Sequence, residues 1–485
     1  MTDIAYDEIK YPYSIRPATH VTRLASIAHL LGRSAPPVEH CNVLEIGGGN
    51  AVNLVNMALG LPEGRFLSID ISEEAVKDGR DLLRATGVTN VTCEAIDLRD
   101  IPDSAGPFDY VIAHGVYAWV PDEVREAILA LLGKLLSPQG VAMVSDNAQP
   151  GCRPRQVIRD LLLRATRNVT DRQSRIEVAR KTLEFYIGLW DTKKAFPATL
   201  NDESRLLVRR PEAVMFHDEM GAYYNPQLFT DVVADAARYG LAYLGDTQLG
   251  LLSDAVFPSD LFEKCLPLSG GDFIEFEQIR DFAEVRSFRQ TVLCRAGAPI
   301  ERHFEASRLS NLFVDGRLER VFPPETKEGE YIFKTQHGGE FSTRNQSFAE
   351  SLIHLAEIFP ASEPVASLSE DPEALEALMN VFLMGGVEFM TAPFPVKATL
   401  GDRPRGSRLA RAEVAFGLKE VSSLRHTYVS LDESGVRFLE RLDGSRDAAQ
   451  LAAEMAPILG LTLEEARARV HKGLADFNRL GLIEA

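Results

Sequence analysis

Short apolar runs alternate with amphipathic stretches along the first third of the chain. Apolar runs of strand length cover residues 42–47, 65–70, 91–97, 108–114 and 140–146. Residues 50–60, a stretch that begins at Ser72, and residues 122–136 instead place apolar side chains at the spacing of one helix face. Ser72 is a favourable N-cap, with acidic residues directly after it. Strands that alternate with helices predict an α/β fold, a parallel sheet covered by helices on both faces.

Each predicted strand ends in a polar residue. These residues are Glu45, Asp70, Asp97, His114 and Asp146. In parallel sheets of this kind, ligands bind beyond the carboxyl ends of the strands. The sequence therefore predicts that the functional site lies along this edge of the sheet.

A glycine-rich turn, EIGGGNA at residues 45–51, joins the first predicted strand to the first helix. Such a turn lets the backbone approach a nucleotide closely. The dinucleotide pattern GxGxxG would require a third glycine where the chain has Val52, and Glu45 would repel a pyrophosphate. A cationic sulfonium ligand with an amino-acid tail tolerates this acid, so an NAD-dependent oxidoreductase is disfavoured.

Two further strand-end acids suit a nucleoside. Asp70 can accept hydrogen bonds from both ribose hydroxyls, and Asp97 with Leu98 suits the exocyclic amine and face of an adenine. With the glycine turn, these acids resemble those of class I S-adenosylmethionine-dependent methyltransferases. The resemblance implies a Rossmann-like sheet and S-adenosyl-L-methionine as cofactor. The expected cofactor-binding residues are Glu45, Gly47, Gly49, Asn50, Asp70, Ile71, Asp97, Leu98, His114 and Gly115.

A longer resemblance covers nearly the whole chain. The segments that carry it are YDEIKYPY, FDYVIAHGVYAWVPDEVR, FHDEM, LAYLGDTQL and FRQTVLC. They are similar to bacterial, rickettsial-type protein-lysine methyltransferases with a methyltransferase regulatory domain. The resemblance implies a lysine acceptor and a dimerisation region. The chain departs from the family at Ala51, usually glycine, and at Asp146, Gln149 and Cys152, which replace aromatic residues.

The acceptor side of the site is expected in two loops, after residues 108–114 and after residues 140–146. A lysine with an unperturbed pKa of about 10.4 must lose its proton before it can attack a methyl group, so polar groups are needed there. We expect Tyr117, Asp146 and Asn147 to be catalytic, and Trp119, Tyr13, His20 and Gln149 to bind the substrate. Packing under the following helix is the alternative for Tyr117 and Trp119, and docking at the surface is the alternative for the N-terminal aromatic residues.

The remaining pattern predicts four regions. A helix with Asn225 as N-cap and Pro226 in its first turn, followed by two strands, should complete the sheet. The predicted regions are a methyltransferase domain (1–153 and 222–297), a helical insertion (154–221), an α+β middle regulatory domain (298–400) and a winged-helix-like domain (401–485). The insertion suits a lid, a dimer surface or an extra packed layer. Residues 308–321 and 332–345 suggest two strand pairs, and residues 398–413 suggest a linker or exposed loop.

Composition narrows the partners. The 485 residues carry a formal charge of −18, which disfavours a broad electrostatic contact with nucleic acid. No apolar run is long enough to span a bilayer, the N-terminus does not resemble a signal peptide, and five scattered cysteines suggest neither disulfides nor a metal site. We therefore expect a cytoplasmic protein, with a homodimer as one possible assembly.

Two functional alternatives remain open beside a protein or peptide lysine acceptor. The polar residues Asp146, Gln149 and Cys152 also suit methyl transfer to a small metabolite or to a non-lysine group of a modified peptide. A non-catalytic scaffold that binds the cofactor and acts through its C-terminal regions is the other alternative.

Overall fold

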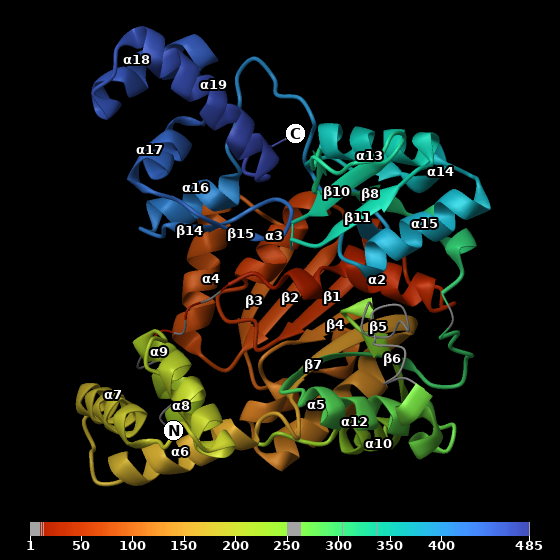
Figure 1. Ribbon diagram of the computed structural model, residues 1–485. Helices are drawn as coiled ribbons and strands as arrows, with labels where there is room; N and C mark the ends of the chain where they lie inside the picture. Colours follow the sequence, from red (N-terminus) through yellow and green to blue (C-terminus); the bar gives the residue numbers. More distant parts are fainter. Residues whose placement is uncertain are drawn as a thin grey trace.

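A seven-stranded sheet forms the centre of the molecule (Figure 1). The computed structural model describes residues 10, 12, 14–249, 263–302, 304–336 and 338–484. The strands are β1 (Asn42–Ile46), β2 (Arg65–Asp70), β3 (Val91–Ala95), β4 (Phe108–Ala113), β5 (Leu136–Asn147), β6 (Leu241–Asp246) and β7 (Phe288–Arg295). Their order is β3-β2-β1-β4-β5-β7-β6, and β7 alone runs antiparallel to its neighbours in this sheet. This confirms the predicted Rossmann-like methyltransferase sheet.

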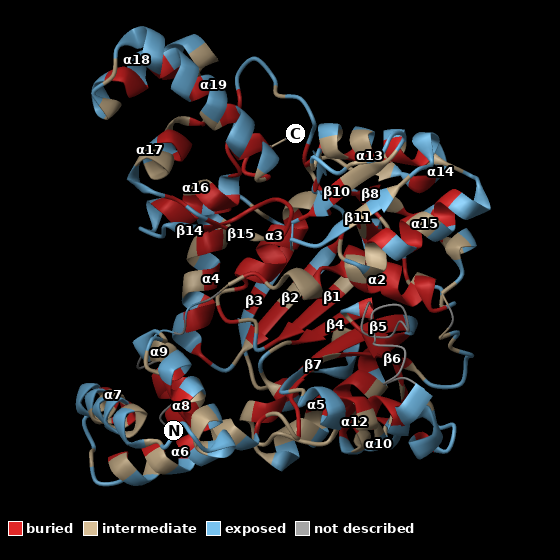
Figure 2. Ribbon diagram, viewed as in Figure 1, coloured by how far each residue is buried: buried red, intermediate tan, exposed pale blue. Residues whose placement is uncertain are grey.

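Helices cover both faces of the sheet. One face carries α2 (Val21–Leu30), α3 (Val52–Gly60) and α4 (Glu73–Thr86), and the other carries α5 (Asp122–Leu135), α10 (Phe229–Ala237) and α12 (Phe273–Glu284) (Figure 1). Side chains alternate between these layers, since successive strand residues point to opposite faces. Met143 belongs to the core under α2 and α3, whereas Val144 belongs to the core under α5 and α10. The strands are accordingly buried along most of their length (Figure 2).

Helix boundaries follow local capping, with one correction. Ser72 caps α4 as predicted, because its hydroxyl accepts a hydrogen bond from the Ala75 N–H (3.1 Å). The prediction that Asn225 caps a helix was wrong, since α10 begins only at Phe229. The chain before it is extended, and Gln227 forms a bridge with Ala148 after the end of β5.

Residues 153–219 form a helical layer at one end of the sheet, at the lower left of Figure 1. The helices are α6 (Arg153–Thr166), α7 (Arg172–Leu189), α8 (Ala195–Leu207) and α9 (Glu212–Val214), followed by a π-helical turn (Met215–Glu219). They enclose a small hydrophobic core of their own, which includes Ile158, Leu183 and Met215.

Two small sheets and three helices follow the central sheet. The strands are β8 (Phe313–Asp315), β9 (Leu318–Val321), β10 (Tyr331–Thr335), β11 (Glu340–Thr343), β12 (Glu363–Pro364) and β13 (Glu388–Met390), and the helices are α13 (Gln346–Ile358), α14 (Val365–Leu368) and α15 (Pro372–Leu383). The predicted pair at residues 332–345 is confirmed by the antiparallel β10 and β11. The pair predicted at residues 308–321 was wrong, because β8 joins β12 and β13 while β9 joins β10. The two small sheets thus separate strands that are adjacent in sequence.

The C-terminal region contains a hairpin and four helices. They are α16 (Arg408–Ala415), β14 (Glu420–Ser422), β15 (Tyr428–Ser430), α17 (Glu433–Arg441), α18 (Ala448–Leu459) and α19 (Leu463–Arg479). The loop predicted for residues 398–413 was partly wrong: Ser407 caps α16, which buries Leu409 and Ala412. In the part of the chain that the structure describes, no helix is long and apolar enough to cross a membrane.

Candidate active site

The glycine-rich turn brings the backbone of β1 and α3 close to the end of β2. The N–H groups of Gly47 and Gly48 both donate to the Ile69 carbonyl, at 2.9 and 3.1 Å. Gly47 and Gly49 have positive φ angles of 69° and 55°, which glycine adopts without strain. A Cβ at Gly48 would overlap the Ser68 hydroxyl. The turn is therefore a tight cradle that only glycine fits, as a nucleoside-binding turn requires.

Glu45 is buried at the end of β1. Its Oε1 accepts a hydrogen bond from Asn53 Nδ2 (2.7 Å), while its Oε2 makes no hydrogen bond among the described residues. Burial raises the pKa of Glu45 to about 8, and Asn53 opposes that shift. A buried carboxyl with an unsatisfied oxygen suits a cationic ligand group, since the positive charge would favour its ionised form.

Asp70, at the end of β2, accepts hydrogen bonds from the glycine-rich turn and from the turn that leads into α4. Its Oδ2 accepts from the Gly49 N–H and its Oδ1 from the Ser72 N–H, both at 2.9 Å. The carboxylate is therefore oriented at the mouth of the glycine turn. The side chain of Ile71 beside it is half exposed, at 50%, and Asn50 Oδ1 accepts a hydrogen bond from the Val52 N–H (3.1 Å) just before α3.

Asp97 already has a partner. Its carboxylate accepts from the Arg99 backbone N–H and from the Arg99 guanidinium, at 2.5 to 2.9 Å. These hydrogen bonds hold the pKa of Asp97 below its usual value. Leu98, next to it, is buried. An adenine amine would have to share Asp97 with Arg99, a competition that the sequence did not indicate.

His114 and Gly115 lie where β4 meets the strand-end segment of β5. The Gly115 N–H donates to the Ser145 hydroxyl (2.8 Å), which ties the two strand ends together. Burial lowers the pKa of His114 to about 3, so its ring is neutral at physiological pH. Its Nδ1 makes no hydrogen bond among the described residues.

The two aromatic candidates after β4 have different surroundings. Tyr117 is 1% exposed and belongs to the hydrophobic core under α5, with the Arg125 guanidinium 5.8 Å from its ring centre. This burial agrees with the packing alternative for Tyr117. Trp119 instead packs against Tyr224 in a tilted arrangement, with ring centres 4.8 Å apart, and the Arg155 guanidinium of α6 lies 5.2 Å from its ring centre. Trp119 therefore faces the helical layer and not the sheet core.

Asp146 and Asn147 at the end of β5 are both buried. Neither carboxyl oxygen of Asp146 makes a hydrogen bond among the described residues. Burial raises the pKa of Asp146 to about 7, although the charge of Arg289 opposes the shift. A buried carboxyl without hydrogen bonds is costly to the fold, and such groups concentrate at functional sites.

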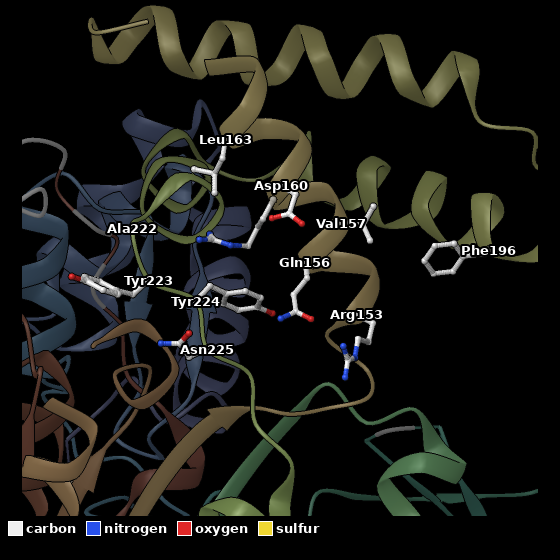
Figure 3. Close-up of a pocket in the computed structure, with 11 residues that line it drawn as sticks. Arg153, Gln156, Val157, Asp160, Leu163, Phe196, Ala222, Tyr223, Tyr224 and Asn225 are labelled. Atoms are coloured by element: carbon white, nitrogen blue, oxygen red, sulfur yellow. The ribbon is translucent and has the colours of Figure 1, made fainter. Parts of the chain in front are cut away.

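The segment that includes the end of β5 and the residues after it, Ser145–Cys152, lies beside an open cleft. Gln149 Nε2 donates to Gln156 Oε1 (3.0 Å), and Gln156 lines a cleft of about 610 Å³ between α6 and residues 222–225. Figure 3 shows Gln156 and Tyr224 pointing toward each other across this space. The lining residues are Arg153, Gln156, Val157, Arg159, Asp160, Leu163, Phe196, Ala222, Tyr223, Tyr224 and Asn225.

Of the N-terminal aromatic candidates, the structure describes His20. Tyr13 lies outside the described residues, as do Tyr6 and Tyr11. His20 caps α2, and its ring packs edge-on against Phe394 and His426, each 5.0 Å away. Contacts with the last third of the chain therefore enclose the ring of His20, which we expected to bind the substrate.

Several residues that shape the site were missed. Arg155 pairs with the fully buried Glu219 (3.1 and 2.5 Å), and Arg155 and Arg159 stack on Tyr224 at 5.3 and 4.8 Å. Glu219 belongs to FHDEM, a segment that carried the family resemblance, and this was the available signal. Its pairing with Arg155, 64 positions away, could not be inferred from a single sequence.

Comparisons with known proteins agree with this geometry. The sheet order, the glycine cradle and the strand-end acids define a class I methyltransferase. A family model described as "Methyltransferase domain" matches residues 37–226, "Predicted methyltransferase regulatory domain" matches residues 211–295, and "PKMT, C-terminal winged helix domain" matches residues 402–459. The regulatory-domain match thus covers residues 211–295, whereas we expected this domain at residues 298–400. The match ends with the last strand of the central sheet.

Full-length relatives narrow the class to a family. The chain is 32% identical to protein RP789 of Rickettsia prowazekii over 472 residues, covering 91% of this chain and 84% of that one. It is 30% identical to protein RP028 of the same organism over 48% of this chain and 94% of the relative. The structure of PKMT2 from Rickettsia typhi in complex with AdoHcy superimposes with a TM-score of 0.85, at 23% identity, over 98% of this chain and 99% of the other.

The chain therefore belongs to the family of rickettsial-type class I S-adenosylmethionine-dependent methyltransferases that carry a regulatory domain. It is an enzyme, and S-adenosyl-L-methionine is its cofactor.

Proposed function

We propose that this enzyme methylates a side-chain amine, that of lysine, in a protein or peptide. The observation that carries the proposal is the cleft beside Ser145–Cys152, which is open, about 610 Å³ in volume and lined by both aromatic and polar side chains. A long aliphatic chain with a polar end fits such a lining. Further support comes from the match to the PKMT winged helix domain and from the likeness to PKMT2.

The strand-end residues are proposed to hold the cofactor. Glu45 would face its amino-acid tail, Asp70 the ribose hydroxyls, and Asp97 with Leu98 the adenine. The glycine cradle supports this assignment, because Gly47, Gly48 and Gly49 leave no side chain between the sheet and a ligand. When bound, the cofactor supplies a methyl group on a sulfonium. The residues of the segment Ser145–Cys152 would hold the lone pair of the acceptor nitrogen on the methyl carbon, so that a C–N bond would form while the C–S bond breaks and its electron pair stays on the sulfur.

The acceptor must be deprotonated and held in line with that bond. We assign the proton to Asp146, whose pKa of about 7 makes it a carboxylate at pH 8. Asn147 and Gln149 are proposed to orient the acceptor at the same segment. Trp119 and Tyr224 would form the aromatic wall of the approach, since aromatic faces attract an ammonium group. Tyr117, buried in the core, would support this wall from behind.

Transfer of radiolabel tests the proposal. The purified enzyme is incubated with S-[methyl-³H]adenosylmethionine and a cell lysate, and the acid hydrolysate of the protein fraction is separated. Label should appear in methyl-lysine, and Asp70→Ala should abolish it by removing the ribose contact. Label confined to small molecules would refute the protein acceptor. It would favour the alternative in which Asp146, Gln149 and Cys152 recognise a metabolite.

The role of Asp146 has its own test. Asp146→Asn should lower kcat by about 100-fold, within the range for loss of a general base, while the Kd for S-adenosylmethionine stays within about twofold. In the wild type, kcat/KM should rise with pH through about 7, because the carboxylate forms there, and the variant should lack this limb. Unchanged turnover in Asp146→Asn would remove Asp146 from the mechanism.

We also propose a homodimer. Four large apolar side chains on α7 and α8 are 53–65% exposed: Phe185, Leu189, Phe196 and Leu206. Exposed apolar groups gathered on one layer favour association with a complementary apolar surface, here a second copy. Sedimentation velocity should give a dimer, and Phe185→Ser with Leu189→Ser should give a monomer. A monomeric wild type would contradict the proposal.

A further inference from the structure

A hairpin of the C-terminal region reaches the back of the cofactor turn. The turn between β14 and β15, Ser423–Thr427, lies against α3, the helix that begins directly after the glycine cradle. At its tip, His426 is completely buried and adopts a positive φ of 57°. Positive φ is uncommon for histidine, so the surrounding contacts must hold this backbone in place.

The His426 ring contacts two asparagines of α3. Its Nδ1 lies 2.7 Å from Asn56 Oδ1, and its Nε2 lies 2.9 Å from Asn53 Oδ1. Asn56 Nδ2 donates back to the Ser423 carbonyl (2.9 Å), which closes a ring of contacts between hairpin and helix. Burial lowers the pKa of His426 well below its usual value, so its neutral ring carries a single N–H; in the Nε2–H tautomer this group donates to Asn53 Oδ1, and burial keeps water from replacing that hydrogen bond.

Asn53 connects the hairpin to the proposed cofactor site through hydrogen bonds. Its Nδ2 donates to Glu45 Oε1 at 2.7 Å, and its Oδ1 also accepts from the Arg16 N–H at 2.9 Å. Asn53 is 3% exposed and Glu45 is 5% exposed. Asn53 is thus the direct partner of the Glu45 carboxylate and a direct neighbour of His426.

We propose that His426 is a positioning residue for the cofactor, because it fixes Asn53, which orients the Glu45 carboxylate. The C-terminal region then completes a cofactor site whose other residues lie more than 300 positions earlier in the chain. Coupling of this kind is reciprocal, so occupancy of the cofactor site also stabilises the hairpin against α3. The inference rests on the proposed assignment of Glu45 to the cofactor.

Calorimetric titration with S-adenosylmethionine at pH 8.5 tests it in the full-length protein. His426→Asn is the main variant, since asparagine tolerates positive φ but is too short to reach Asn53. Its Kd should rise by about tenfold, the value of one buried hydrogen bond, while kcat at saturating cofactor stays within about twofold. Asn53→Ala should weaken binding at least as much. In the double variant the effects on the Kd should not add, because His426 acts on the cofactor site through Asn53.

Two controls separate the outcomes. Val421→Ala removes apolar packing from the same hairpin but leaves the hydrogen-bonded series His426–Asn53–Glu45 intact. It should therefore lower the Tm and leave the Kd for S-adenosylmethionine unchanged. Glu45→Gln tests the underlying assignment: if it binds S-adenosylmethionine like the wild type, the role of Glu45 fails. If Glu45→Gln weakens binding but His426→Asn does not, or if the double variant is fully additive, the positioning role of His426 is overturned.

Discussion

Two buried carboxyl groups at strand ends change their charge near neutral pH. Glu45 and Asp146 belong to different strands, yet burial raises the pKa of each, to about 8 and about 7. Each also has at least one oxygen without a hydrogen bond among the described residues. A protein retains such groups at a cost in stability, and the cost is understandable where a cation binds or a proton is transferred.

Cofactor affinity should therefore increase with pH. In the ligand-free protein Glu45 is mostly neutral below pH 8, and a cationic ligand favours its ionised form, so binding releases a proton. The Kd for S-adenosylmethionine should fall on the order of tenfold between pH 6.5 and 8.5. Titration calorimetry in buffers of different ionisation enthalpy measures both the Kd and the proton release. In Glu45→Gln the Kd should be nearly independent of pH, and a wild-type Kd that does not change would contradict the assignment.

The sequence predicted where the candidate site residues lie along the strands better than it predicted which side chains surround them. The acids at the ends of β1, β2 and β3 follow from strand periodicity and were predicted. The Arg99 partner of Asp97 and the enclosure of His20 were not, and the burial of Tyr117 was considered only as the alternative to a catalytic role. The enclosure of His20 depends on distant segments, of which one sequence carries no direct record, whereas the Asp97–Arg99 pair is local and depends on side-chain conformations that strand periodicity does not determine.

Among the elements, the segment after β5 is fixed by its backbone neighbours. The Ala148 N–H donates to the Ser287 carbonyl (2.9 Å), and the Gly151 N–H donates to the Arg286 carbonyl (3.0 Å). Cys152 Sγ donates to the same Ser287 carbonyl (3.0 Å). The segment that we propose for the acceptor therefore depends on the start of β7.

Gly151→Ala should displace this segment. A Cβ there would overlap the backbone of Val285 and Arg286, which cannot move as a flexible side chain would. We expect a loss of about 2–4 kcal/mol in the free energy of unfolding, measured by urea denaturation, and a fall in turnover. Gly188→Ala is the matched control, because its Cβ meets nothing within 4 Å in α7 and should stabilise the protein by up to about 1 kcal/mol. Equal stabilities of the two variants would contradict the packing described.

Within the helical layer, the ion pair of Arg155 and Glu219 joins α6 to the π-helical turn. Glu219 is fully buried, and Arg155 also stacks on Trp119 and Tyr224. Glu219→Ala should cost up to about 3–5 kcal/mol, since it leaves the buried guanidinium with only the more distant Asp218 carboxylate (3.5 Å), and should raise the acceptor KM more than the cofactor Kd. Glu177→Ala, which breaks an exposed pair with Lys181 on α7, should cost less than about 0.5 kcal/mol. A Glu219→Ala variant as stable as Glu177→Ala would show that the pair does not hold this layer.

Across the whole molecule, one hydrophobic core joins the central sheet to the region that follows it. Leu24 and Ile27 of α2, Met143 of β5, and Val314 and Leu352 after the sheet belong to the same cluster. The C-terminal region has a separate core, which includes Leu439, Leu451 and Val470. Strand periodicity predicted the α/β sheet and its order of elements, whereas this shared core spans more than 300 positions and left no local signature.

The C-terminal region and the region before it should differ in their ability to fold as isolated fragments. Residues 401–485 expressed alone should retain helical circular dichroism and unfold cooperatively, because their core is largely self-contained. Residues 298–400 alone should show no cooperative thermal transition, because α2 and the central sheet supply part of their core. A cooperative transition of the second fragment would contradict the shared core.

We propose that the cofactor lies across the ends of β1 to β4, with its sulfur toward the end of β5. A structure of the protein bound to S-adenosylhomocysteine tests this most directly. We predict the ligand against Gly47–Gly49, Glu45 and Asp70, with the sulfur facing Ser145–Cys152 and the cleft between α6 and residues 222–225. A sulfur that faces away from Ser145–Cys152, or a ligand bound elsewhere, would contradict the account.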